Sequence, residues 1–306
     1  RASSVSASMR ERLFCSDAAR VRQDSNTATA TRVDVWILVE LSATWGARPL
    51  LDAQMPANVR ATLTSAIAEI PRCRVVFIRR RFETRSGCRV YIARSAPKPW
   101  IASFDLPSID DVATLPFRQL ARSGGGTPAL LPVVLVCTHG QRDSCCGRRG
   151  FPLYDALRHD ASLDVWQCSH IGGDRFAANA VVLPWGLYYG PVEPGDAAVL
   201  SASIQRGEIL LDAYRGRSSM PRLGQAAETF VRRASGITAR DALQITGRTT
   251  LDDGRTHVHL RDVDGTLHEV TLEQFVSAES ALLTCTATAT CPIVQFRMVD
   301  YRATPA

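Results

Sequence analysis

The chain has 306 residues, of which 45% are hydrophobic and 22% are charged, and its mean hydropathy is −0.04. This composition is typical of a globular protein with room for two or three domains, and no apolar run reaches the roughly eighteen residues of a membrane span. A formal charge of +6 would suit nucleic-acid binding, but Lys98 is the only lysine among 36 basic residues, which indicates a compositional bias toward arginine and makes a nucleic-acid partner a poor expectation.

Residues 1–30 are polar, and we expect them to form a flexible, weakly ordered tail. They contain no apolar signal-peptide core, so we expect a cytoplasmic location. From residue 31 to 122 strand and helix patterns alternate, which predicts an N-terminal α/β region. Its strands are expected at 33–41, 73–79, 88–94 and 100–106, and its helix at 57–70. Three glycines within residues 123–128 predict a linker.

The central region, residues 128–215, predicts a thioredoxin-like domain. Its elements are expected as a strand at 131–137, a helix from Pro152 to residue 160, a strand at 164–168, a hairpin at 180–190 and a helix at 195–213. Strand, helix, strand, hairpin and helix are the element order of that fold. The loops that follow its first two strands are expected at one edge of the sheet.

Residues 220–306 predict a small α+β domain. Two short helices, at 224–235 and 239–245, are expected to precede strands at 255–261, 266–272 and 292–301. His257 and His259 share the polar face of one of these strands, and we interpret them as surface residues. Neither a disulfide nor a ligand pair is favoured for Cys285 and Cys291, and the role of this domain stays open.

The cysteines are clustered in the central region. Of the nine, four lie within 32 residues, Cys137, Cys145, Cys146 and Cys168, and two histidines lie close to them, His139 and His170. In a reducing compartment such clustering indicates metal or redox chemistry. Cys137 and Cys146 border one loop and His170 lies on the facing loop, so three ligands can converge. Thiolate and imidazole are both ligands of iron–sulfur clusters.

Two long stretches carry a resemblance to a known family. VLVCTHGQRDSCCGRRG at 134–150 and CSHIGGDRFAANAVVLPWGLYYGPV at 168–192 resemble the sucrase/ferredoxin-like proteins, and WILVE and WGARPL within 36–50 resemble the N-terminal half of that family. The likeness covers most of residues 33–215. It implies a thioredoxin-like ferredoxin domain with a 2Fe-2S cluster and electron transfer to a redox partner protein. The chain has no carboxylate pair of the kind that glycoside hydrolysis needs, so we expect no sucrase activity.

The resemblance also implies a ligand set. The family's first two cysteine positions fall on Cys137 and Cys146, and its third ligand position falls on His170. The fourth position holds histidine or cysteine in relatives but Asp174 here. A carboxylate is a harder donor than a thiolate, so Cys168 and Cys145 remain alternatives for this position.

Two other functions compete with electron transfer. One is a thioredoxin-like thiol redox protein, in which Cys145 or Cys146 attacks and Cys137 or Cys168 resolves, although no Cys-x-x-Cys motif begins a helix. The other is a scaffold with structural zinc, for which two thiolates, an imidazole and a carboxylate form an acceptable tetrahedral set. We expect an electron carrier more than an enzyme. The donor, the acceptor and the oligomeric state stay open.

Overall fold

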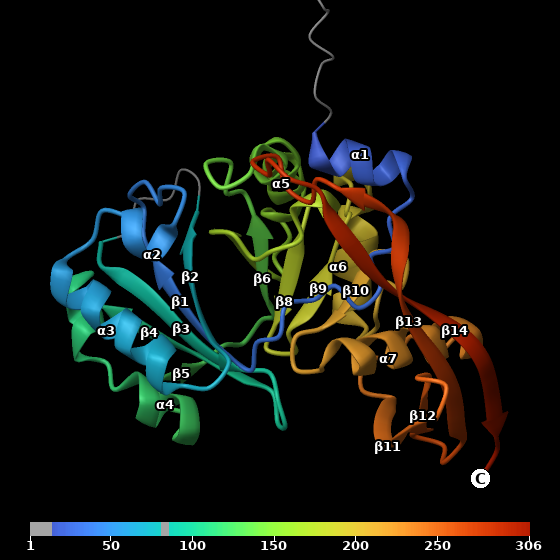
Figure 1. Ribbon diagram of the computed structural model, residues 1–306. Coiled ribbons are helices and arrows are strands. Elements are labelled where there is room, and N and C mark those ends of the chain that lie inside the picture. Colours follow the sequence, from blue (N-terminus) through green and yellow to red (C-terminus); the bar gives the residue numbers. More distant parts are fainter. Residues whose placement is uncertain (1–13, 81–85) are drawn as a thin grey trace, which may run out of the picture.

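The computed structural model describes residues 14–80 and 86–306, which form two β-sheets with flanking helices (Figure 1). The larger sheet has the strand order β10-β9-β8-β6-β7-β2-β1-β3-β4-β5. Its strands are β1 (Val35–Glu40), β2 (Cys73–Arg79), β3 (Cys88–Arg94), β4 (Trp100–Leu106), β5 (Thr127–Pro128), β6 (Val133–Cys137), β7 (Asp164–Cys168), β8 (Ala180–Leu183), β9 (Leu187–Tyr189) and β10 (Tyr214–Arg217).

The smaller sheet pairs its four strands in chain order, and most of the helices pack beside the larger sheet. The small-sheet strands are β11 (Leu243–Thr250), β12 (Thr256–Asp262), β13 (Leu267–Ala281) and β14 (Cys291–Thr304). The helices are α1 (Cys15–Val21), α2 (Pro49–Asp52), α3 (Ala57–Glu69), α4 (Phe117–Ser123), α5 (Ser144–Leu157), α6 (Ala197–Gln205) and α7 (Arg222–Ser235). No helix in the described ranges is long and apolar enough to cross a membrane.

The larger sheet consists of two units with the same topology. In the second unit β6 and β7 run parallel with α5 between them, β8 is antiparallel to β6, and β9 is antiparallel to β8. In the first unit β1, β2, β3 and β4 repeat this arrangement, with α3 between β1 and β2. The prediction of an α/β chain with a thioredoxin-like domain is therefore confirmed, and the N-terminal region repeats that topology.

The two units join where β2 pairs antiparallel with β7, through Ile78 opposite Cys168 and Arg79 opposite Gln167. This contact makes one continuous sheet of the predicted N-terminal region and the predicted central domain. All five residues of β6 are buried, because successive side chains point to opposite faces and both faces are covered. Val134 and Val136 pack toward α5, whereas Leu135 and Cys137 face the other side.

Helix α5 begins at Ser144, eight residues before the predicted start at Pro152. The side chain of Asp143 caps it by accepting a hydrogen bond from the N–H of Cys145. The glycines near its start made this helix hard to predict from the sequence. One of them, Gly150, is required by packing, because a Cβ there would lie 1.9 Å from the carbonyl oxygen of Cys137. The earlier start places Cys145 and Cys146 in the first helical turn.

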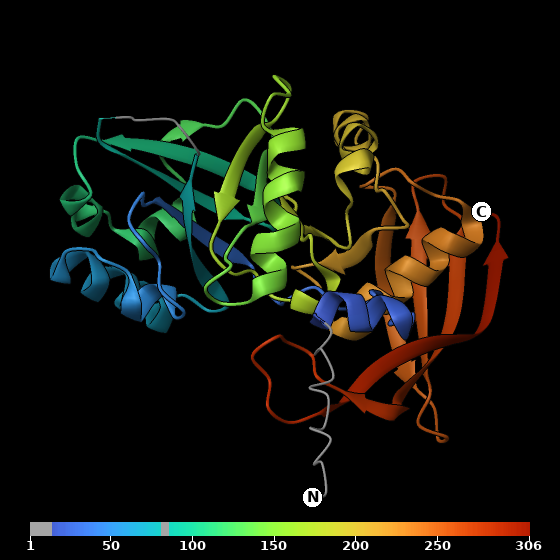
Figure 2. The same cartoon turned by 90° about the horizontal axis from the view of Figure 1, so that it is seen from above.

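Residues 1–30 were expected to form a weakly ordered tail. Residues 1–13 lie outside the described residues, and residues 14–30 differ from the expectation because they include a packed helix. Helix α1 buries Cys15, Ser16 and Ala19. It packs against the turn of residues 174–176 and lies beside α5 (Figure 2). The short helix gains its stability from these tertiary contacts, which its polar sequence does not reveal.

The C-terminal region contains α7 and the smaller sheet. Ala227 and Val231 of α7 pack against Leu260 and Val270 of the strands. The helix predicted at 239–245 is wrong, because β11 begins at Leu243 and tertiary packing overrides the local pattern. Strand β13 runs nine residues beyond its predicted end at 272, whereas β14 lies close to its predicted range, and the two strands carry the loop of residues 282–290 up to α5 (Figure 1).

Candidate metal centre

Three metal-binding side chains converge at the carboxyl ends of β6 and β7. Cys137 is the last residue of β6, Cys146 lies in the first turn of α5, and His170 follows β7 by two residues. One ligand atom of each lies within 4.8 Å of the other two. The structure thus brings together three of the predicted site residues, from two loops that leave neighbouring parallel strands.

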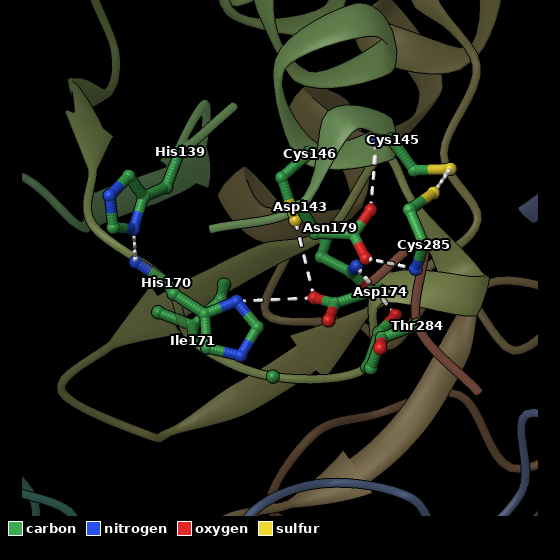
Figure 3. A network of polar contacts seen from close by, with 12 residues as sticks. His139, Asp143, Cys145, Cys146, His170, Ile171, Asp174, Asn179, Thr284 and Cys285 are labelled. Carbon is green, nitrogen blue, oxygen red and sulfur yellow. Dashed lines mark hydrogen bonds and ion pairs between the residues drawn. The ribbon is translucent and has the colours of Figure 1, made fainter. Parts of the chain in front are cut away.

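Asp174 contacts two of these three residues (Figure 3). Its Oδ1 atom accepts a hydrogen bond from the Cys146 thiol at 3.3 Å and lies 3.1 Å from Nδ1 of His170. The chain reaches this position through a tight turn in which Gly173 has φ +85°, and a Cβ there would lie 2.1 Å from the guanidinium of Arg215. The turn places the carboxylate beside the imidazole four residues earlier.

The site is buried on one side and open on the other. Cys137 and Cys146 are each 1% exposed, and Asp174 is also buried. The side chain of His170 is 19% exposed and is therefore the outermost of the four. Two thiols, an imidazole and a carboxylate around one point form a donor set that fits a thiophilic metal or an iron–sulfur cluster.

Contacts within the site shift the pKa values of its members. Hydrogen bonds from Cys146 and Cys168, assisted by His170, hold the pKa of the Cys137 thiol well below its usual range despite burial. The hydrogen bond to Cys137, together with burial, raises the pKa of Cys146. Burial lowers the pKa of His170, but contacts with Asp174 and Cys137 outweigh it and raise the pKa to about 9. These contacts favour negative charge on the Cys137 sulfur and a proton on His170, and a metal that binds the ring would displace that proton.

His139 orients the site from outside it. Its Nε2 atom lies 2.6 Å from the carbonyl oxygen of Gly46, and its Nδ1 atom accepts a hydrogen bond from the N–H of His170 at 3.2 Å. The ring also meets Trp45 edge-on. Both ring nitrogens are used, so His139 holds the loop after β6 against the residue that follows β7 and against Gly46. Trp45 and Gly46 belong to the WGARPL motif, so the first thioredoxin-like unit supports the site of the second.

The two alternative fourth ligands have different surroundings. Cys168 is fully buried opposite Cys137 in the β6–β7 register, and burial raises the pKa of its thiol. Cys145 points away from Cys146 and contacts Cys15 and Cys285, at sulfur–sulfur distances of 3.5 and 3.3 Å (Figure 3). A hydrogen bond from Cys15 is the largest of the effects that lower the pKa of Cys145 to about 6.

Sequence reasoning missed the contacts of Cys15 and Cys285. They lie 130 and 140 residues from Cys145, and only the packing of α1 and of the 282–290 loop onto α5 brings them together. His257 and His259 lie on the half-exposed face of β12 with Glu269 near both rings, in agreement with their interpretation as surface residues.

Comparison with known proteins supplies a family model and several relatives. A model described as sucrase/ferredoxin-like matches residues 26–216. "Altered inheritance of mitochondria protein 32" from Meyerozyma guilliermondii is 34% identical over 96 residues, which is 28% of this chain and 34% of that protein. The protein of the same name from Debaryomyces hansenii is 33% identical over 95 residues, which is 28% of this chain and 35% of that protein. The match thus spans about a third of the length of these curated relatives.

Among solved structures, a thioredoxin-like [2Fe-2S] ferredoxin from Aquifex aeolicus is similar to part of the chain. The likeness covers 30% of this chain and 97% of the ferredoxin, at 19% sequence identity and a TM-score of 0.27.

Proposed function

Because this chain belongs to the sucrase/ferredoxin-like family, we propose that it is an electron carrier with one 2Fe-2S cluster. Cys137, Cys146, His170 and Asp174 would hold the cluster, which supplies one-electron transfer when bound. The protein's contribution is to orient these side chains, to exclude water from the thiols and to leave the imidazole near the surface.

The observation that carries the proposal is the convergence of Cys137, Cys146 and His170 within 4.8 Å at the strand ends. Iron–sulfur clusters are bound by soft thiolates, and imidazole replaces thiolate in some of them with a rise in reduction potential. Asp174 contacts both Cys146 and His170, which supports it as the fourth ligand. It is a harder donor than cysteine, so we expect this position to be the most labile of the four.

Burial argues against the thiol redox alternative. A thiol that attacks an external disulfide must be reachable, whereas Cys137, Cys146 and Cys168 are each at most 1% exposed. Zinc at this site remains the competing metal. Sulfide content separates zinc from a 2Fe-2S cluster, because bound zinc needs no sulfide.

The location of the protein also stays a prediction. We expect the cytosol, where thiols are kept reduced, although the relatives' printed name refers to mitochondria.

We expect the anaerobically purified protein to contain about two iron and two acid-labile sulfide per chain. Its absorption between about 320 and 600 nm should bleach on addition of dithionite, because reduction weakens the sulfur-to-iron transitions. Metal and sulfide analysis on the same sample checks this. A chain without acid-labile sulfide after anaerobic preparation would contradict the proposal.

A basic hollow beside His170 supports a docking site for the redox partner. The hollow has a volume of about 230 Å³, and Arg48, Arg74 and Arg142 line it together with His170. Arg74 donates a hydrogen bond to the backbone oxygen of His170 at 2.7 Å. His170 is the outermost member of the site, so electrons would pass through it to a partner with an acidic surface.

This basic hollow predicts a charge effect on electron transfer. Arg142→Glu should slow oxidation of the reduced protein by ferricyanide, an anionic oxidant, by about three- to tenfold at low salt. Arg118→Glu is the matched control, since Arg118 is an exposed arginine that lines a different hollow on α4. Stopped-flow rates at two ionic strengths measure the effect, which should shrink as salt rises. Equal slowing by both variants would contradict a specific role for the hollow.

A further inference from the structure

We propose that the chain holds a second metal site, a structural zinc ion bound by Cys15, Cys145 and Cys285 with Asp143 as the fourth donor. One ligand atom of each residue lies within 4.8 Å of the others. The residues come from α1, the first turn of α5 and the 282–290 loop, so the site joins three segments far apart in the chain. The proposal rests on these residues alone and does not depend on the 2Fe-2S cluster.

The spacing of the sulfurs favours one metal ion over a disulfide. The three Sγ–Sγ distances are 3.5 Å between Cys15 and Cys145, 3.3 Å between Cys145 and Cys285, and 3.6 Å between Cys285 and Cys15. Thiolates on one tetrahedral zinc lie about 3.8 Å apart, given Zn–S bonds of about 2.3 Å. A disulfide would join one pair at about 2.05 Å and leave the third thiol out. The three sulfurs are nearly equally spaced, so no one pair is placed to form a disulfide in preference to the others.

Asp143 is placed to complete the set. Both of its carboxylate oxygens lie 3.8 Å from the sulfur of Cys15. One oxygen accepts the N–H of Cys145 at 2.9 Å and the other accepts the N–H of Cys285 at 2.6 Å. Such hydrogen bonds orient a ligating carboxylate without using all of its lone pairs. The same residue therefore caps α5 and holds the 282–290 loop in place.

Hydrogen-bond donors contact the sulfur of Cys145, as they do around bound thiolates. The hydroxyl and the backbone N–H of Ser16 both donate to Cys145, at 3.2 and 3.5 Å. Arg149 donates to the Ser16 hydroxyl at 3.0 Å, and the positive end of the α5 dipole faces the site. Zinc would bind all three sulfurs as thiolates, and the protons that they still carry would be released to solvent. These donors offset the negative charge that results.

The site gives the C-terminal region a role that the sequence left open. Cys145 and Cys146 are adjacent in the first turn of α5 but point to different clusters. A zinc ion on Cys145 would fix that turn, and with it the position of Cys146. The loop between the long strands β13 and β14 places Cys285 beside α5. The C-terminal sheet would therefore stabilise the turn that holds Cys146 in the candidate iron–sulfur site.

Metal analysis of the 306-residue chain tests the proposal. We expect about one zinc per chain in the wild type and less than about a tenth of that in Cys15→Ser and in Cys285→Ser. Cys291→Ser is the matched control, because Cys291 lies at the start of β14 and is exposed and free. This control should retain the zinc. Wild-type protein without zinc, or either of the two cluster variants with zinc retained, would overturn the proposal.

X-ray absorption at the zinc edge of the wild type makes the test independent of how well the variants fold. We expect three sulfurs at about 2.3 Å and one oxygen at about 2.0–2.2 Å. Two sulfurs and an imidazole would place the zinc at Cys137, Cys146 and His170 and would overturn the proposal. Iron and sulfide measured on the same sample test the 2Fe-2S cluster separately, so failure of one proposal is distinguished from failure of the other.

Discussion

Cys137→Ala and Cys146→Ala are each expected to abolish the iron–sulfur centre, with iron and sulfide falling below about a tenth of the wild-type content. Each substitution removes a buried thiolate and leaves one iron open to water. Cys145 cannot replace Cys146 as a donor, because its side chain points toward Cys15 and Cys285. Visible absorption and iron content after anaerobic purification measure the loss.

Cys88→Ala is the matched control for this loss. Cys88 is 2% exposed, so the substitution removes a buried thiol of the same size from β3, which is separated from β6 by three strands of the sheet. It should leave the spectrum unchanged, as should Cys73→Ala. Loss of the cluster in Cys145→Ala together with its survival in Cys146→Ala would show that the assignment of the adjacent cysteines is reversed.

The candidate metal centre could be predicted from the sequence because its members are close in the chain. Cys137 and His170 follow neighbouring strands whose apolar patterns are clear, and parallel strand ends meet at one edge. The start of α5 could not be predicted, since its glycines and polar residues resemble a loop. Only the fold shows that Gly150 is needed for contact with the Cys137 carbonyl.

The cluster around Cys145 could not be predicted for a different reason. Cys15 lies in a seven-residue helix and Cys285 in a loop between two long strands, and neither has a local motif. Their approach depends on non-local packing of α1 and of the 282–290 loop onto α5. The repeated topology of the first unit was also hidden, because that unit keeps the strand order of the second without its cysteine and histidine ligands.

A reduction potential that falls with rising pH is the second large effect that we expect, and it follows from His170 as a ligand. A neutral imidazole places less negative charge on iron than a thiolate does, so the potential should exceed that of all-cysteine ferredoxins. Asp174 and Cys137 already raise the pKa of His170 to about 9, against the effect of burial. Negative charge near the ring therefore favours its protonated form. An electron added to the cluster also brings negative charge close to His170, so it should favour protonation of the ring as well.

The sign of the pH dependence follows from this coupling. If His170 takes up a proton on its free nitrogen as the site gains an electron, low pH favours the reduced form and the potential drops as protons become scarce. The slope cannot exceed about 59 mV per pH unit for one proton and one electron. Midpoint potentials measured from about pH 6 to 9 cover the titration range of the imidazole.

Two variants separate His170 from Asp174 in this measurement. His170→Cys replaces a protonatable neutral ligand with a thiolate, so its potential should be lower and independent of pH. Asp174→His removes a negative charge beside Cys146 and His170, so its potential should rise. The exposed edge of His170 makes proton exchange with solvent feasible, which the buried thiols do not allow. A flat wild-type profile, or a potential indifferent to both substitutions, would mean that neither residue is a cluster ligand.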